Sequence, residues 1–86
     1  MWDVRFTHNA EKDKKLLKQA GLESKAKKLL DVLSVNPYQN PPSYEKLSGD
    51  LTGYYSRKIN IQHRLVYRVD ENNHTVIVHA MWSHYE

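Results

Sequence analysis

The sequence predicts an α+β fold, in which a short N-terminal strand and two helices precede a three-strand C-terminal meander. The helices are expected to pack on one face of the antiparallel sheet that the meander completes. Three observations lead to this prediction. Apolar residues recur at helical spacing between residues 8 and 35, and they alternate with polar residues from residue 54 onward. Between these two regions lies a turn-rich segment that contains all three prolines and two of the three glycines.

The first third of the chain predicts a strand and two helices. The alternation of apolar and polar residues in "WDVRFT" predicts a strand over residues 2–6. Thr7 is a suitable N-cap for the lysine-rich helix that we expect over residues 8–20. Leucines and alanines at helical spacing predict a more strongly amphipathic helix over residues 22–35, and Pro37 ends it.

The rest of the chain predicts a long loop followed by three strands. The segment "NPYQNPPSYEKLSGDLTG", residues 36–53, is expected to be a loop with one short turn, and loops of this length are often functional. Alternating patterns predict strands over residues 54–61, 63–70 and 75–84. Short connections make these strands an antiparallel meander, on which the two helices bury their leucines. The opposite face is left open and carries Arg64 and Arg68.

Composition limits the class of protein. A chain of 86 residues with 40% apolar residues predicts one globular domain over residues 1–86. The absence of cysteine excludes disulfides and thiolate metal sites. We find no apolar signal segment and no membrane-spanning run, so a cytoplasmic protein is expected. The net charge of +3 favours an anionic partner.

The motifs exclude several kinds of catalysis. The five histidines do not form a metal-ligand spacing, and no glycine-rich phosphate loop or nucleophile elbow is present. The remaining groups suit metal-independent cleavage of an RNA phosphodiester, which needs a base, an acid and a cation beside the developing negative charge. Glu45 in the long loop, Arg64 on a strand and His84 at the end of the next strand could converge at one edge of the sheet.

Residues 44–69, "YEKLSGDLTGYYSRKINIQHRLVYRV", together with "HY" at 84–85, closely resemble the Txe/YoeB family of toxins of type II toxin–antitoxin systems, which are RelE-like. The resemblance implies a RelE-like fold and an endoribonuclease without cofactor or metal that cuts mRNA on the ribosome and inhibits translation. It implies that Glu45 is the general base, Arg64 stabilises the transition state and His84 is the general acid. It also implies that RNA is held by four side chains: Lys46, Arg57, Lys58 and Tyr85.

The resemblance also implies partners, and the sequence leaves alternatives open. A cognate antitoxin of the YefM/Axe-like kind, the ribosome and mRNA are the expected partners, and a homodimer is one assembly to consider. An alternative function is a non-enzymatic binding module on the same scaffold, either a topoisomerase inhibitor or a degenerate toxin that still binds its antitoxin. A general RNA-binding domain is a third alternative, for which binding would depend steeply on salt.

Strand pairing decides whether the three catalytic candidates can meet. Side chains alternate between the two faces of a sheet, so the pairing of Arg64 with the last strand determines the face of His84. If Arg64 lies opposite Trp82, His84 is expected on the face of Arg64. If Arg64 lies opposite Met81, His84 is expected on the core-facing side. The sequence leaves this register open.

Overall fold

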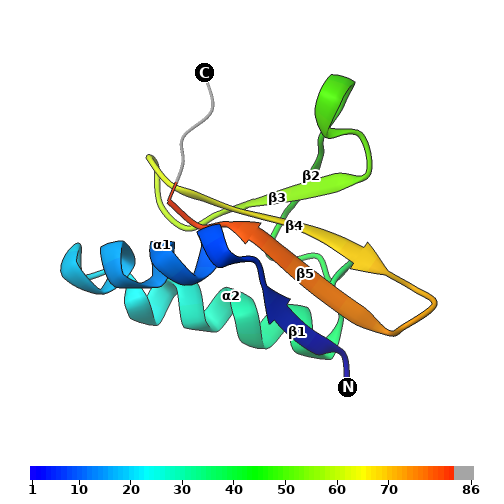
Figure 1. The fold of residues 1–86 in the computed structure, drawn as a ribbon, viewed down its shortest axis with the longest axis horizontal. Coiled ribbons are helices and arrows are strands. Elements are labelled where there is room, and N and C mark those ends of the chain that lie inside the picture. The colour runs from blue at the N-terminus through cyan, green and yellow to red at the C-terminus, as the bar shows by residue number, and fades with distance from the viewer. Residues whose placement is uncertain (83–86) are drawn as a thin grey trace.

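The computed structural model describes residues 1–82, and it consists of a helix layer on one face of a five-stranded sheet. The chain order is β1 (Asp3–Phe6), α1 (His8–Gln19), α2 (Glu23–Val35), β2 (Glu45–Lys46), the 3₁₀ turn η1 (Gly49–Leu51), β3 (Tyr54–Lys58), β4 (Arg64–Asp70) and β5 (Thr75–Ala80). The strands are ordered β1-β5-β4-β3-β2 across the sheet. Figure 1 shows both helices on the same side of the sheet, with β2 at the far edge from β1.

The predicted fold class is confirmed, and the pairing of β1 adds a feature that the sequence pattern did not contain. Strands β3, β4 and β5 form the expected antiparallel meander. Strand β1, however, pairs with β5 in parallel, so the sheet is mixed. A parallel pair cannot be joined by a tight hairpin, and the chain between β1 and β5 passes through both helices and the other strands.

The loop predicted over residues 36–53 contains more regular structure than expected. Glu45 and Lys46 form the short edge strand β2, which pairs antiparallel with β3, and η1 follows it. Strands β3 and β5 are shorter than predicted. They end at Lys58 and Ala80. In β3 the reason is a tight turn, in which the carbonyl of His63 accepts from the amides of Ile59 and Asn60 at 2.9 and 3.3 Å.

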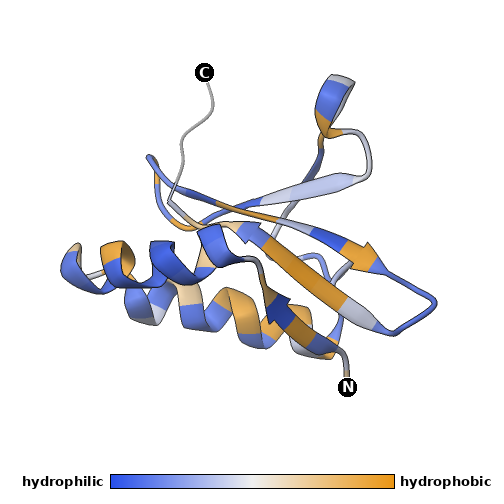
Figure 2. Cartoon of the chain, viewed as in Figure 1, coloured by the Kyte–Doolittle hydropathy of each residue, from blue (hydrophilic) through white to orange (hydrophobic). Residues whose placement is uncertain are grey.

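The hydrophobic core lies between the helices and the sheet. Figure 2 shows apolar residues along β5 and in bands on α2, whereas most of α1 is hydrophilic. Burying one such aliphatic side chain contributes about 1.5–3 kcal/mol, so this layer supplies most of the stability. The buried residues of the core cluster are Ala10, Leu17, Ala26, Leu29, Leu33, Ile59, Leu65, Tyr67, Val76, Val78 and Met81.

The face of the sheet away from the helices, which we call the open face, is set by strand alternation. The register pairs Tyr54 with Arg68, Ser56 with Val66 and Lys58 with Arg64, so these six residues share one face. Leu65 and Tyr67 point the other way, into the core. The prediction that Arg64 and Arg68 lie together on the open face is confirmed.

A β-bulge in β5 shifts its register with β4 by one residue, and the pairing of the two strands ends at Val66 and Ala80. Tyr67 pairs with Val78, but Val66 pairs with Ala80, so one extra residue is inserted in β5. Continuing the pairing from Val66 and Ala80 by two residues would place Arg64 opposite Trp82. Without the bulge, the same count from Tyr67 would place Arg64 opposite Met81.

Candidate active site

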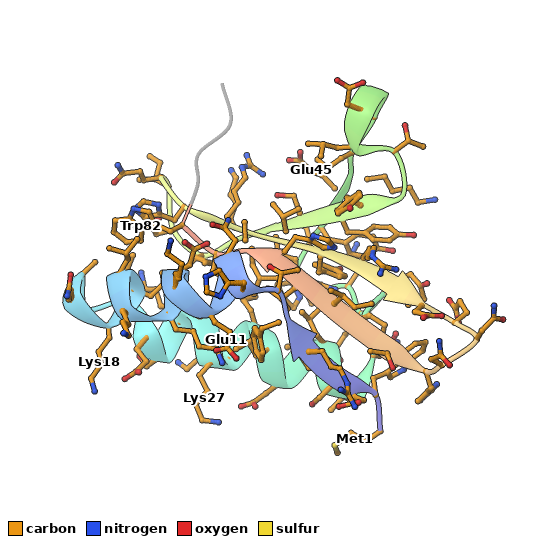
Figure 3. The ribbon with its side chains drawn as sticks, viewed as in Figure 1. Met1, Glu11, Lys18, Lys27, Glu45 and Trp82 are labelled. Carbon is orange, nitrogen blue, oxygen red and sulfur yellow. The ribbon has the colours of Figure 1, made fainter. Side chains whose placement is uncertain are left out.

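Glu45 and Arg64 meet on the open face. An Oε1 atom of Glu45 on β2 lies 3.6 Å from Nη1 of Arg64 on β4, with β3 between the two strands. The Glu45 side chain is 64% exposed and the Arg64 side chain 23%, so both charges can be reached from solvent. Figure 3 shows Glu45 on the side of the sheet away from the helix residues Lys18 and Lys27. The structure therefore brings together two of the three predicted catalytic side chains.

A second cation adjoins this pair. Lys58 is exposed at the end of β3 and lies directly opposite Arg64 in the antiparallel register. Like charges that face each other across two strands are destabilising by themselves. The two neighbouring cations can attract an anion such as a phosphate, whose negative charge would relieve this repulsion, whereas the carboxylate of Glu45 repels it.

Lys46 lies outside this group. It is the neighbour of Glu45 on β2 and pairs with Tyr55, whereas Glu45 pairs with Ser56. Because successive strand side chains point to opposite faces, Lys46 is directed away from the face that carries Glu45. Lys46 is exposed.

Arg57 requires a correction, because the structure buries it. Its relative exposure is 1%, and its guanidinium donates hydrogen bonds to one hydroxyl and three backbone carbonyls. The side chain alternates with Ser56 and Lys58, so it points to the core-facing side of β3. The prediction that Arg57 contacts RNA is wrong for this structure. Strand alternation could have revealed this, since Arg57 is two residues from Tyr55 and therefore points to the same, core-facing side of β3.

The last two described residues are fixed against the helix layer. The buried carboxylate of Asp13 on α1 accepts hydrogen bonds from the backbone amides of Met81 and Trp82 at 2.9 and 3.2 Å. The Trp82 ring stacks on His63, with ring centroids 3.9 Å apart and an interplanar angle of 19°. Trp82 is therefore a packing residue. Sequence analysis did not identify Asp13, since an acidic residue among lysines on a helix reads as a surface residue.

His84 and Tyr85, the predicted acid and the predicted terminal RNA contact, lie outside the described residues. Their roles stay predictions.

Tyr54, Arg68 and His79 form a second group on the open face. The rings of Tyr54 and His79 meet edge to face, with centroids 4.7 Å apart, and Tyr54 pairs with Arg68. Burial, assisted by the nearby positive charge of Arg68, lowers the pKa of His79 below its ordinary value. The neutral imidazole is therefore favoured at this position.

Two features are absent from the described part of the chain, namely a metal-binding cluster and a membrane-spanning helix. Within residues 1–82, no three His, Asp or Glu side chains gather in a way that could hold a metal ion. No helix in this part of the chain is both long enough and apolar enough to cross a membrane.

Comparisons with known proteins give one consistent family. The family described as "YoeB-like toxin of bacterial type II toxin-antitoxin system" matches residues 1–85. "Toxin YoeB" of Streptomyces coelicolor is 36% identical over 80 residues, which cover 93% of this chain and 86% of that protein. The resemblance seen in residues 44–69 thus extends over nearly the whole chain.

Solved structures agree with this assignment. A "YoeB/ParE toxin from Agrobacterium tumefaciens" is 28% identical, with a TM-score of 0.87 over 96% of this chain and 99% of that chain. The toxin in the YoeB–YefM complex from Staphylococcus aureus is 34% identical, with a TM-score of 0.81 over 99% of both chains. The family match, the sequence identity and the fold agree, and the chain belongs to the YoeB-like toxins of bacterial type II toxin–antitoxin systems.

Proposed function

We propose that this toxin is a ribosome-dependent endoribonuclease that cleaves mRNA by general acid–base catalysis and thereby inhibits translation. The observation that carries the proposal is the meeting of Glu45 and Arg64, from different strands, on the open face at 3.6 Å. Lys58, directly opposite Arg64, adds a second cation for the phosphate.

The chemistry assigns one task to each group. Glu45 removes the proton from the ribose 2′-hydroxyl, and the 2′-oxygen forms a bond to phosphorus. The bond from phosphorus to the 5′-oxygen breaks, and the imidazolium of His84 donates a proton to that leaving oxygen. Arg64 stabilises the extra negative charge on the phosphoryl oxygens, and its planar guanidinium can bind two of them at once. The products are a 2′,3′-cyclic phosphate and a 5′-hydroxyl.

The strand register supports the part of the proposal that involves His84. If the bulged register continued past Ala80, Arg64 would lie opposite Trp82, and this is the pairing under which His84 is expected on the face of Arg64. Asp13 holds the backbone of Met81 and Trp82, two residues before the proposed acid. Tyr85 and Lys46 remain candidates for holding RNA. Arg57 is not among them, because it is buried.

The test is to incubate purified toxin with ribosomes programmed with a defined mRNA and to map the ends of the message. The parent is expected to cleave it, and Glu45→Gln and His84→Ala should each lower the rate by about 10²–10⁴, the range for one acid–base group. Variants that cleave as fast as the parent would contradict the assigned roles. Inhibited translation with intact mRNA would show a non-enzymatic binder instead.

The partner of this toxin is a cognate antitoxin of the YefM/Axe-like kind, and its place of action is the cytoplasm, where mRNA is translated. The solved Staphylococcus aureus relative, a heterotetrameric YoeB–YefM complex, supports the first part. A YoeB dimer from the same organism, 35% identical to this chain, supports a homodimer as a second assembly. Co-expression with the product of the neighbouring gene, followed by co-purification, tests the antitoxin.

A further inference from the structure

We propose that Arg57 is a positioning residue, which holds the loop preceding β2 and thereby keeps Glu45 beside Arg64. The proposal rests on the proposed role of Glu45 as the base. Arginine is among the residue types least often buried, yet Arg57 is 1% exposed and is among the largest fully buried side chains of this protein. A side chain of this kind needs partners for its N–H groups, and they show what it does.

The guanidinium of Arg57 binds the loop through three backbone carbonyls. Its Nη2 atom donates to the carbonyl oxygens of Pro37 at 3.0 Å and Gln39 at 2.9 Å. Its Nη1 atom donates to the carbonyl oxygen of Pro42 at 2.5 Å. The rigid, planar fork of donors allows one side chain to reach all three acceptors, and a lysine could not match this geometry.

Tyr67 completes the arrangement from β4. Its hydroxyl accepts from Nε of Arg57 at 3.2 Å and donates to the carbonyl oxygen of Pro37 at 2.8 Å. Burial raises the pKa of the Tyr67 phenol, and the charge of Arg57 opposes this shift without cancelling it. The phenol therefore keeps its proton and continues to donate to the loop.

The contacts reach the residue next to Glu45. The ring of Tyr44 lies 4.9 Å from Cζ of Arg57 and meets the ring of Tyr55 edge to face at 5.7 Å. Glu45 follows directly and begins β2, an edge strand of only two residues. A strand of this length forms few backbone hydrogen bonds. The contacts with Arg57 are therefore a large part of what orders the segment that precedes Glu45.

The chemistry of the site favours this role over simple filling of space. The hydrogen-bond acceptors around Arg57 are carbonyls and a hydroxyl rather than a carboxylate, so its burial is not a buried ion pair. An apolar side chain could fill the volume without the cost of removing a cation from water. The guanidinium is explained by the carbonyls that it binds, and these belong to the segment that leads to Glu45.

The experiment measures kcat and KM for steady-state cleavage on programmed ribosomes, well below the unfolding temperature, for Arg57→Gln, Arg57→Lys and Tyr67→Phe. Arg57→Gln is expected to lower kcat by about 10- to 100-fold with little change in KM, since a displacement of about 1 Å in a catalytic group can cost this much. Arg57→Lys should not restore the rate. Tyr67→Phe keeps the ring and removes one donor and one acceptor, so it should fold and show a smaller loss. Arg5→Gln, at an exposed arginine on β1, is the matched control and should retain the parent kcat.

A double variant separates positioning from direct contact with RNA. If Arg57 acts through Glu45, Arg57→Gln should cause little further loss of rate in a Glu45→Gln background. Independent, multiplicative losses would overturn the proposal. So would an unchanged kcat in a folded Arg57→Gln protein.

Hydrogen exchange tests the same idea without any activity. Arg57→Gln should speed amide exchange in residues 38–47, and Arg5→Gln should not. Exchange that is unchanged in this segment would overturn the positioning role. If the parent toxin cleaves no mRNA, the proposed function fails, and the exchange result still decides whether Arg57 holds the loop.

Discussion

Ser56 lies on the strand between Glu45 and Arg64 and shares their face of the sheet. Glu45 pairs with Ser56, and Ser56 pairs with Val66, so Arg64 lies two residues away from this row along β4. Ser56 is buried and small, and the longer side chains of Glu45 and Arg64 reach each other past it. A bulky residue at position 56 would separate the two charges.

Arg64 offers a direct test of transition-state stabilisation. We expect Arg64→Ala to lower the cleavage rate by about 10²–10³, comparable with the removal of one preorganised donor in other enzymes. Arg64→Lys should recover only part of this loss, because lysine keeps the charge but not the two-pronged geometry. Single-turnover cleavage of ribosome-bound mRNA is the measurement. Arg68→Lys, on the same face, serves as the control, and an equal loss in both lysine variants would contradict the prediction.

His79 predicts a loss of stability in mild acid. Its pKa is lowered in the folded protein by burial and by Arg68, so the unfolded chain binds the proton more readily. Stability is therefore fully present above the unfolded pKa of about 6.5 and decreases as the pH falls below it. Urea midpoints at pH 7.5 and 5.5 should differ less in His79→Gln than in the parent. His8→Gln, at an exposed position on α1, should retain the parent difference; a reduced difference in both variants would contradict this reading.

Among the elements, helix α1 does more than cover the sheet. Thr7 caps it by accepting from the amide of Ala10 at 3.2 Å, and its hydroxyl donates to the carbonyl of His79 at 3.1 Å. Asp13, two turns from the cap, binds the backbone just beyond β5. The helix is thus joined at two points to the strand that precedes the proposed acid.

Asp13→Ala should destabilise the protein by about 1–3 kcal/mol, because the amides of Met81 and Trp82 would lose their acceptor in a buried site. Urea unfolding is the measurement. Lys12→Ala, at the exposed neighbouring position, should change the free energy of unfolding by less than about 0.5 kcal/mol. If the two variants are equally stable, the hydrogen bonds of Asp13 contribute little.

The bulge in β5 has a consequence beyond its own residues. It shifts the pairing with β4 by one residue, and in a sheet a shift of one residue exchanges the two faces. Val78 and Met81 both belong to the core, although they are three residues apart, because the bulge lies between them.

Across the protein, positive charge is divided between two sides with different surroundings. Lys18 and Lys27 lie on the helix layer, away from Glu45, and Lys27 pairs with Asp31 at 3.5 Å. Arg64 and Lys58 lie on the open face beside the candidate base. We expect RNA to bind the second side, although the helices carry more lysines.

The salt dependence of RNA binding distinguishes the open face from the helix layer. For binding of a single-stranded RNA oligonucleotide, each phosphate contact contributes about 0.7 to the slope of log K against log salt. Lys58→Gln should therefore reduce the slope by about 0.7, whereas Lys27→Gln should leave it close to that of the parent. Fluorescence anisotropy titrations over a range of salt concentrations give both slopes. Equal reductions would show that RNA binding is spread over the surface.

The local pattern of the chain was sufficient for both helices, for the presence of strands β1, β3, β4 and β5, and for one face of the sheet. Helical spacing of leucines gave both helices to within two residues, and alternation in β4 placed Arg64 and Arg68 together. These features depend on neighbours along the chain, so the spacing of apolar residues in the sequence predicts them. The resemblance of residues 44–69 gave the family, which the comparisons confirm.

Other features arose from contacts between distant segments, which periodicity does not encode. The parallel pairing of β1 with β5, the bulge in β5 and the short strand β2 all depend on which strands meet in space. Arg57 shows the difference most clearly. The family resemblance implied a contact with RNA, but the position of Arg57 on β3 directs its side chain to the core-facing side, where loop carbonyls replace water around the guanidinium. The chemistry of a residue limits what its side chain can bind, and the three-dimensional packing of the chain determines which of these partners it has.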